Sequence, residues 1–419
     1  MQMIFIVYSL WDFHFEGHLP APFFYDQRDT FMDLFNTNYW ANRAGRYEDW
    51  NSIYPIFTFM LGQWLTPDRC VVLSSPMMRT CSAGSIWFLV AFYALGAISC
   101  GALAIRHLQF TGARRFGIFL LISFMVFFAM PGLFALERGN YIVLSFLCLA
   151  LSEWSGRDWK GALFLAMAIN IKQYLILLWL APFLKRRYDY LVVSILFSIG
   201  INLFAMILVQ DDHYSMVLEN MLGFSSGMYT GFFEKMWYTT SFLAWLKALE
   251  LSPDLARFFD PALLSFGMLA ASLMMGAIAL LALGSILTLI SRASEVSWEL
   301  ICLIVLVALL MVTDSLGGYS LLLLIPYLVT LLVRQQLQPV LPLLLLLFTP
   351  LDWVIGPHHL SEGKSYLSGV YMNNIAGLTV ESYLRPGALV LLMIYLIYTV
   401  FESSSRKNSL QVQKNLVLE

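Results

Sequence analysis

The sequence predicts an all-α membrane protein, a single domain over residues 1–419 built as a polytopic bundle of about 11–12 transmembrane helices. Three observations favour this fold class. Only 12% of the residues are charged, against about 25% in a typical soluble domain. Hydrophobic residues make up 59% of the chain, with a mean hydropathy of +0.72. Apolar runs such as 84–105 and 116–136 can each span roughly 30 Å of hydrocarbon, and the alternation typical of membrane β-barrel strands is missing.

The helices are expected in the following order. Segment 1–15 is short for a span and lacks the basic start and the cleavage site of a signal peptide, so we expect a shallow first helix. The further spans are 83–105, 116–136, 140–153, 161–171, 173–184, 188–209, 262–290, 298–313, 319–333, 339–350 and 386–401. Several of these are too short to cross a bilayer comfortably, which is typical of helices that stop partway and leave a cavity.

Basic residues in the short loops predict the orientation, because cytoplasmic loops carry an excess of Lys and Arg. One alternation of the helices places 13 of the 25 basic residues inside with only 7 of the 27 acidic ones. These basic residues lie near positions 106–115, 157–160, 185–187, 292 and 334 and in the cytoplasmic tail 402–419. The long loops 15–82, 210–261 and 351–385 are then extracytoplasmic. The protein as a whole is expected in the cell (inner) membrane.

Lys172 is the one full charge in the apolar run "AMAINIKQYLILLWLAP" (166–182). A lysine at the centre of a spanning helix costs about 2.5–3.5 kcal/mol, so it usually faces a cavity, a partner or the interface. If 161–184 formed one helix, every later loop would invert and the basic run 185–187 would lie outside. We therefore predict a hairpin that turns at Lys172, at the outer face.

Acidic residues gather at the start of the first outer loop. Asp26, Asp29 and Asp33 are spaced i, i+3 and i+7, which on a helix is one face. Such a row of carboxylates forms either a solvated helix N-terminus or a catalytic or substrate-binding site. It could also hold a divalent ion, although no metal is required.

Polar corners elsewhere give further candidates. Glu137, Arg138 and Asn140 form the corner "ERGN", which is either an ordinary charged turn or a site that positions a substrate, with Arg138 as a fork for phosphate and Asn140 as a hydroxyl binder. Asp314 has the same two interpretations. His358 and His359 are either acid–base groups or loop histidines. Separately, Cys70 and Cys81 share one loop and could form a disulfide if that loop faces an oxidising compartment.

Two blocks of the sequence resemble the membrane-embedded glycosyltransferase family 87. The first is "DLFNTNYWANRAGRYEDWNSIYPIFTFMLGQWL" (33–65), and the second runs from "ERGN" to the basic run at 185–187. A weaker likeness covers "GGYSLLLLIPYL" (317–328), which contains Tyr319. This chain has Arg138-Gly139 and Gln173 where the family commonly has Gly-Gln and Pro.

The resemblance implies a GT-C fold and transfer of a hexose, possibly mannose, from a polyprenyl-phosphate donor to a glycan or glycolipid acceptor at the outer face of the membrane. It implies that Asp33 is the catalytic carboxylate, with Asp29 as the runner-up, and that Asn140 and Lys172 bind substrate. The reaction would be an inverting displacement with an Asp general base. The chain contains no phosphate-binding G-x-x-x-x-G-K-[ST] motif, which fits a lipid-linked donor.

Three other functions remain open from the sequence. A polysaccharide polymerase or ligase also uses lipid-linked glycans, but such enzymes normally rely on arginines in a large outer loop, and the outer loops here are acidic. A transporter or flippase would favour charges at the membrane midplane and repeated halves. The third is a structural membrane subunit of a larger complex. The net charge of −2 argues against a nucleic-acid partner, and neither the sugar nor the acceptor can be read from the sequence.

Overall fold

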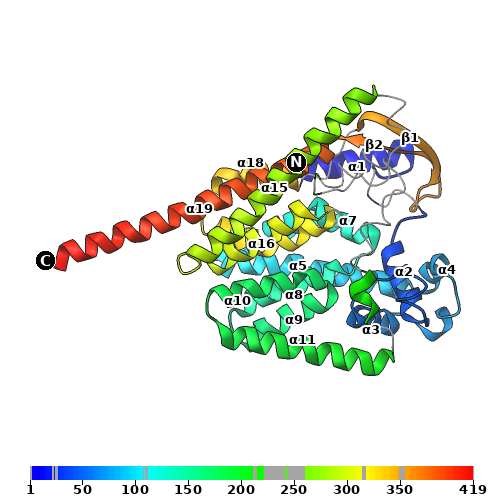
Figure 1. Cartoon of the computed structure of the whole chain (residues 1–419). Helices are drawn as coiled ribbons and strands as arrows, with labels where there is room; N and C mark the ends of the chain where they lie inside the picture. The colour runs from blue at the N-terminus through cyan, green and yellow to red at the C-terminus, as the bar shows by residue number, and fades with distance from the viewer. Residues whose placement is uncertain are drawn as a thin grey trace.

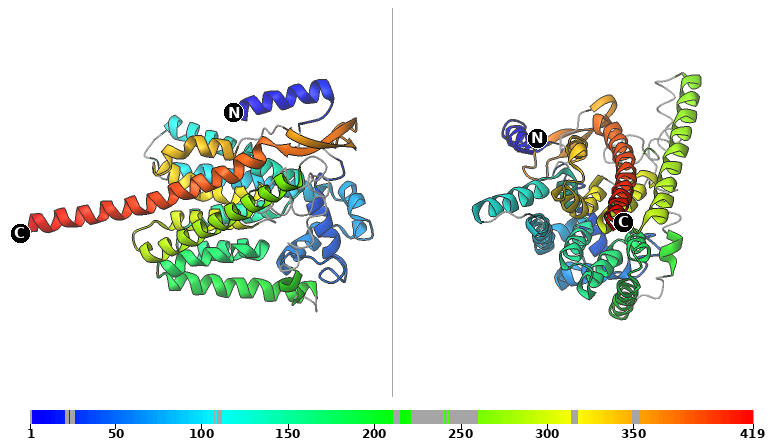
Figure 2. Two further views of the ribbon diagram at one scale, coloured as in Figure 1. Left: turned by 45° about the horizontal axis from the view of Figure 1, so that its top comes forward. Right: turned by 90° about the vertical axis from the view of Figure 1, so that its left-hand side faces the viewer.

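The computed structural model contains a mainly helical bundle with one small β-hairpin (Figure 1). The structure describes residues 2–418 except 21–22, 24–26, 107, 109–111, 211–214, 221–239, 241, 243–259, 314–317 and 349–353. Helices α5, α8, α9, α11 and α16 lie roughly side by side, and the loop-rich elements α2, α3, α4 and the hairpin gather at one end, called here the site end (Figures 1 and 2).

The first half of the chain alternates short helices with apolar ones. Its elements are α1 (Gln2–Glu16), α2 (Met32–Ala41), α3 (Ile56–Leu65), the 3₁₀ helix η1 (Asp68–Cys70), α4 (Ser75–Cys81), α5 (Ala83–Arg106), α6 (Gly112–Phe127), α7 (Met130–Arg138), α8 (Ile142–Ser155), α9 (Trp159–Ile171), the 3₁₀ helix η2 (Gln173–Trp179), α10 (Leu180–Leu184) and α11 (Tyr188–Val209).

The second half completes the bundle and adds the hairpin. Its elements are α15 (Pro261–Arg292), α16 (Trp298–Val312), the 3₁₀ helix η4 (Gly318–Leu324), α17 (Ile325–Val333), the 3₁₀ helix η5 (Gln338–Val340), α18 (Leu341–Leu347), β1 (Val354–Lys364), β2 (Tyr371–Thr379) and α19 (Val380–Leu418).

By length and composition, the described residues contain four helices that could each cross a membrane: α5, α11, most of α15 and the first half of α19. The bent pair α6–α7 makes a fifth if it counts as one span. Seven shorter apolar segments accompany them, including α8, α9 and α16. The chain is thus a helical protein with apolar spans, as the sequence predicts, although most of the expected spans are shorter than a bilayer.

One predicted span is wrong in detail. Segment 116–136 is not one straight helix: α6 ends at Phe127, and α7 starts at Met130 at an angle of 50° to it. Pro131 is the cause, because proline lacks the N–H of a continuing helix and its ring clashes with the preceding turn. Helix α19 runs past the expected span 386–401, through residues 402–418 of the expected tail.

The expected loop 351–385 contains a two-stranded β-hairpin in an otherwise mainly helical fold. Strands β1 and β2 pair in antiparallel register, with Lys364 opposite Tyr371 and His358 opposite Gly377. The connection is closed by hydrogen bonds from the Ser365 N–H to the Val370 carbonyl and from the Gly369 N–H to the Ser365 carbonyl. Segment 15–82, expected as an outer loop, likewise contains the helices α2, α3 and α4 among its described residues.

The predicted hairpin at Lys172 is confirmed. Helix α9 ends at Ile171, Lys172 has an extended backbone (φ −133°, ψ 95°), and η2 with α10 returns the chain. The Arg187 guanidinium at the end of the return donates to the Arg157 carbonyl just before α9, at 2.9 Å. Each arm is about 20 Å long from its helical rise, so Lys172 lies at the site end of the bundle.

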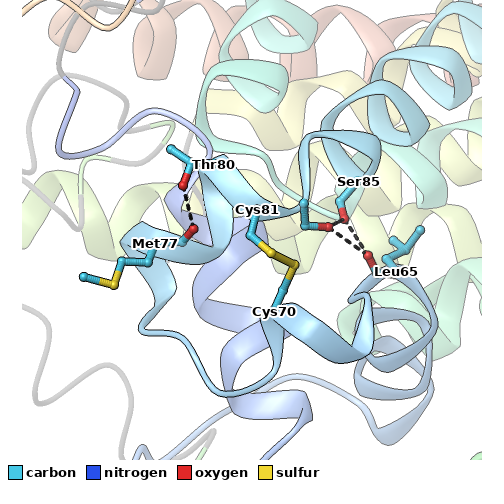
Figure 3. The surroundings of a disulfide bond; sticks show 7 residues. Leu65, Cys70, Met77, Thr80, Cys81 and Ser85 are labelled. Atoms are coloured by element: carbon cyan, nitrogen blue, oxygen red, sulfur yellow. Dashed lines mark hydrogen bonds between the residues drawn. A yellow bond between two sulfur atoms is a disulfide. The ribbon is translucent and has the colours of Figure 1, made fainter.

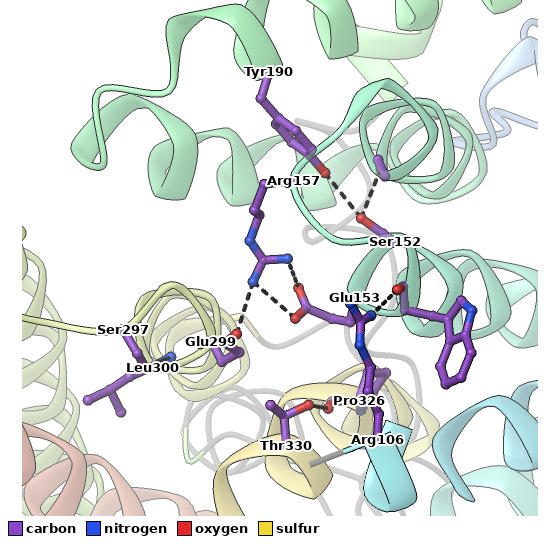
Figure 4. A network of polar contacts seen from close by, with 12 residues as sticks. Arg106, Ser152, Glu153, Arg157, Tyr190, Ser297, Glu299, Leu300, Pro326 and Thr330 are labelled. Atoms are coloured by element: carbon purple, nitrogen blue, oxygen red, sulfur yellow. Dashed lines mark hydrogen bonds and ion pairs between the residues drawn. The ribbon is translucent and has the colours of Figure 1, made fainter. Parts of the chain in front are cut away.

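The opposite end of the bundle is held by a buried ionic cluster (Figure 4). Arg157 contacts the carboxylates of both Glu153 and Glu299, at 3.2 and 3.0 Å. Glu299 is also paired with Arg334 at 3.1 Å. A paired and hydrogen-bonded cluster offsets the cost of removing these charges from water. Basic residues that the sequence assigns to one face, Arg157, Arg187 and Arg334, therefore do share one end.

The site end contains a disulfide that the sequence allowed but did not decide. Cys70 and Cys81 are bonded, with their Cα atoms 5.8 Å apart (Figure 3). The hydroxyl of Ser85 donates to the Leu65 carbonyl beside it at 2.6 Å. The disulfide ties the end of α4 to η1, and the Ser85 contact ties the start of α5 to the end of α3, so these elements are held together at the site end.

Candidate functional site

The site is built on the tight corner between α7 and α8. Gly139 ends α7 in the left-handed conformation (φ +70°), and its N–H bonds to the carbonyls of Ala135 and Leu136. A Cβ at this position would lie 2.9 Å from the Leu34 Cβ and 3.0 Å from the Phe31 Cα. Only glycine therefore fits here, because both the positive φ and the close approach of α2 exclude a side chain.

The segment that carries the two aspartates docks on this corner. The Phe31 N–H donates to the Glu137 carbonyl at 2.6 Å, and the Thr30 hydroxyl donates to the Glu137 carboxylate at 3.3 Å. Phe31 is buried and has a positive φ of 64°, a strained conformation for a bulky residue. Strain of this kind costs about 1–3 kcal/mol and persists where the surroundings fix it. The kink places both Asp29 and Asp33 towards α7.

The predicted single row of carboxylates is therefore wrong. Helix α2 starts only at Met32, so Asp33 lies in its first turn while Asp29 lies in the turn before it. Asp26 lies outside the described residues. The side chain of Asp33 is 19% exposed and that of Asp29 is 62% exposed.

Arg138 binds both aspartates. Its Nη1 pairs with an Asp29 carboxylate oxygen, and its Nη2 lies 2.8 Å from Asp33 Oδ1. One of the two interpretations of the sequence makes Arg138 a fork for phosphate, but in this structure its guanidinium binds two carboxylates. Such charge-assisted bonds are stronger than neutral ones and fix geometry. Arg138 therefore orients the two acids relative to each other.

Asn140 fixes the second oxygen of Asp33. Its Oδ1 accepts a hydrogen bond from the Ile142 N–H at 3.0 Å, so its amide nitrogen faces the other way and donates to Asp33 Oδ2 at 2.9 Å. Asn140 is buried, at 1% exposure. Each carboxylate oxygen of Asp33 keeps a further lone pair for a ligand, and part of the side chain faces solvent.

Lys172 enters the same site from the break after α9. Its ammonium lies 4.6 Å from the centre of the Tyr54 ring and interacts electrostatically with the Asp33 carboxylate. Within the described part of the chain, no side chain hydrogen-bonds or pairs with this ammonium. The break is held by two contacts: the Gln173 amide donates to the Ile53 carbonyl at 2.7 Å, and the Thr58 hydroxyl donates to the Ile171 carbonyl at 3.3 Å.

Two tyrosines complete the surroundings of Asp33. Burial raises the pKa of Tyr54 well above its ordinary value, and the Asp33 carboxylate adds to the shift, so the phenol remains a protonated donor. Tyr319 lies on η4, interacts electrostatically with Asp33 and Arg138, and packs its ring 5.4 Å from that of Phe134. The sequence places Tyr54 in a resemblance motif but gives no sign of its contact with Lys172.

No described contact brings Asp314, His358 or His359 into the site, whereas Glu137 lies beneath it. Asp314 lies outside the described residues. His358 and His359 lie on β1, opposite Gly377 and Ala376 of β2, and only their backbone is described. Glu137 is buried at 4% exposure and acts as the anchor for Thr30 rather than as a surface group.

An apolar groove of about 600 Å³ begins close to Lys172. All of its lining side chains are apolar, and they come from η2, α10, α11, α15 and α16. Ile176 and Leu177, four and five residues after Lys172, are about half exposed in it. At the other end of the return arm lies Phe183, also exposed. In a membrane, such a surface faces the lipid chains.

Comparisons with protein-family models, with curated proteins and with solved structures found no match. Among the described residues, no group of three or more His, Cys, Asp or Glu side chains is arranged to hold a metal ion.

Proposed function

We propose that this protein is an integral-membrane glycosyltransferase that transfers a hexose from a polyprenyl-phosphate donor to a glycan or glycolipid acceptor at the outer face of the membrane. The observation that carries the proposal is the convergence of Asp33, Arg138, Asn140 and Lys172. These residues come from α2, the α7–α8 corner and the break after α9. Arg138, Asn140 and Lys172 all interact with the partly exposed carboxylate of Asp33.

The geometry supports a division of roles. Asp33 is the general base that takes the proton from the acceptor hydroxyl, with its two oxygens oriented by Arg138 and Asn140. Lys172 binds the donor phosphate and stabilises the negative charge that grows on it as the sugar–oxygen bond breaks. A cation on the phosphate and a base on the hydroxyl favour a single displacement that inverts the anomeric centre.

The apolar groove supports a lipid-linked donor. It starts within two helical turns of Lys172 and is lined only by apolar side chains, which suits the isoprenoid chain of a polyprenyl phosphate. The disulfide at the site end supports an oxidising, extracytoplasmic location, because disulfides rarely persist in the cytosol. A GT-C fold, the cell membrane as location and mannose as the sugar are part of the same proposal.

The test is transfer in vitro by the purified protein. Radiolabelled polyprenyl-phosphate hexoses are incubated with acceptors extracted from membranes, and the product linkage is determined by NMR. The proposal expects labelled product with the anomeric configuration opposite to that of the donor. Retention of configuration would contradict the single displacement, and polymer growth from preassembled lipid-linked repeat units instead would favour a polymerase or ligase.

A further inference from the structure

A second pocket lies at the site end, between the β-hairpin and the segment before Asp29. It has a volume of about 220 Å³ and is lined by Gln27, Arg28, Glu362, Gly363, Lys364 and Tyr371. Lys364 and Tyr371 are opposite each other in the strand register, and the Lys364 ammonium lies 4.4 Å from the centre of the Tyr371 ring. Glu362, two residues before Lys364, projects from the same face of the strand.

The pocket is fixed to the catalytic segment. The Gln27 N–H donates to the Lys364 carbonyl at 2.8 Å. The Phe31 ring packs edge-on against Tyr366, with centroids 5.5 Å apart. The Arg79 guanidinium lies 5.1 Å from the centre of the same Tyr366 ring and donates to the Thr30 carbonyl. The hairpin and residues 27–31 therefore form one surface.

The polar groups of the pocket have the mixture that sugar hydroxyls require. Arg28 and Lys364 can only donate hydrogen bonds, Glu362 can only accept them when ionised, and Gln27 can do both. A hydroxyl both donates and accepts, so it can use every one of these groups. A phosphate only accepts, and the Glu362 carboxylate would repel it. Tyr371 adds an aromatic ring, and the residue as a whole is 73% exposed.

We infer that this pocket binds the terminal sugar of the acceptor. The inference deepens the proposed function and rests on it. Arg28 is directly followed by Asp29, and Arg138 pairs with both Asp29 and Asp33, so the pocket adjoins the segment that carries the catalytic carboxylate. In Figure 1 and in the left view of Figure 2, α2 lies between the hairpin and helices α9–α11. The acceptor then approaches Asp33 from the hairpin side and the donor from the Lys172 side.

The first test measures sugar binding without any transfer reaction. Methyl glycosides of mannose, glucose and galactose are added to the purified full-length protein in detergent, and binding is followed by saturation-transfer NMR. We expect Tyr371→Ala to weaken binding about five- to tenfold, Tyr371→Phe to retain it because the ring remains, and Tyr398→Ala, an exposed tyrosine on α19, to leave it unchanged. Equal binding by the wild type and Tyr371→Ala would overturn the inference.

The second test separates this inference from the proposed function. In the transfer assay, Tyr371→Ala and Glu362→Gln should raise the acceptor KM about tenfold and leave the donor KM unchanged. Transfer with an unchanged acceptor KM in both variants would refute the pocket and keep the glycosyltransferase. Glycoside binding that depends on Tyr371, without transfer from any donor, would refute the glycosyltransferase and keep a sugar-binding pocket.

Discussion

Replacing Asp33 with asparagine removes a negative charge and a base while keeping the size of the side chain. The magnitude of the structural cost follows from its two partners. Both Arg138 and Asn140 donate hydrogen bonds to the carboxylate, at 2.8 and 2.9 Å. An amide offers one acceptor and one donor, so Asp33→Asn must lose one of these two bonds in either orientation. The lost bond is worth about 1.5–3 kcal/mol where a charged group is involved.

The catalytic cost should be larger and of another kind. Loss of a general base typically lowers turnover by about 10²–10⁴-fold. A stability loss of the size just estimated lowers the melting temperature by no more than about 10 °C in a chain of this length. We therefore expect a variant that is folded at assay temperature, with an intact disulfide and unchanged size-exclusion behaviour, and a turnover reduced by at least about 10²-fold.

Asp29→Asn is the matched control, because it makes the same substitution at the other carboxylate that pairs with Arg138. Asp29 is mostly exposed and lacks a contact with Asn140, so we expect this variant to lose less than about tenfold in turnover. The assay measures the transfer of radiolabelled hexose from one polyprenyl-phosphate donor, and the melting temperature of each variant is measured in parallel. Full activity in Asp33→Asn with loss in Asp29→Asn would make Asp29 the base, and full activity in both would refute the mechanism.

Three further predictions address the donor cation, the corner and the topology. Lys172→Ala should raise the donor KM at least about tenfold and leave the acceptor KM unchanged, and an unchanged donor KM would contradict phosphate binding by Lys172. Gly139→Ala should destabilise the protein by about 1–3 kcal/mol and lower the melting temperature, because its Cβ has no space and its φ is positive; Gly84→Ala, which meets no atom within 4 Å, is the neutral control. Cysteines introduced at positions 48 and 364 should react with an impermeant reagent in intact cells, whereas one at 335 should react only after permeabilisation. The native free cysteines are buried, so they should not react with the reagent. Labelling of position 335 in intact cells, with 48 and 364 labelled only after permeabilisation, would invert the proposed orientation.

The clustering of the site could largely be predicted from the sequence. Charge asymmetry of the loops required a turn at Lys172, and a turn there brings the end of α9 to the same end of the bundle as the corner before α8. The corner residues Arg138 and Asn140 and the acid Asp33 then had to share that end. What the spacing could not show was the partner of each group, since Arg138 binds Asp29 and Asp33 rather than facing an open pocket.

Features that depend on tertiary contacts were beyond the sequence. The left-handed Phe31 is set by its bonds to Glu137 and its packing on Tyr366, and no local propensity indicates it. The hairpin 354–379 lies in a stretch with mixed polar, histidine and glycine content, which carries little periodic signal. The lengths of the helices were also overestimated at Pro131, where an apolar run continues through a bend.

The class of donor tests the central proposal most directly. The wild-type protein is reconstituted in lipid vesicles with membrane-extracted acceptor. It is then given the same radiolabelled hexose either on a polyprenyl phosphate or on a nucleoside diphosphate. We predict that label passes to the acceptor from the polyprenyl phosphate alone and that free polyprenyl phosphate is released in equal amount. Transfer from the nucleotide sugar, or passage of the lipid-linked sugar across the vesicle membrane without transfer, would contradict the account.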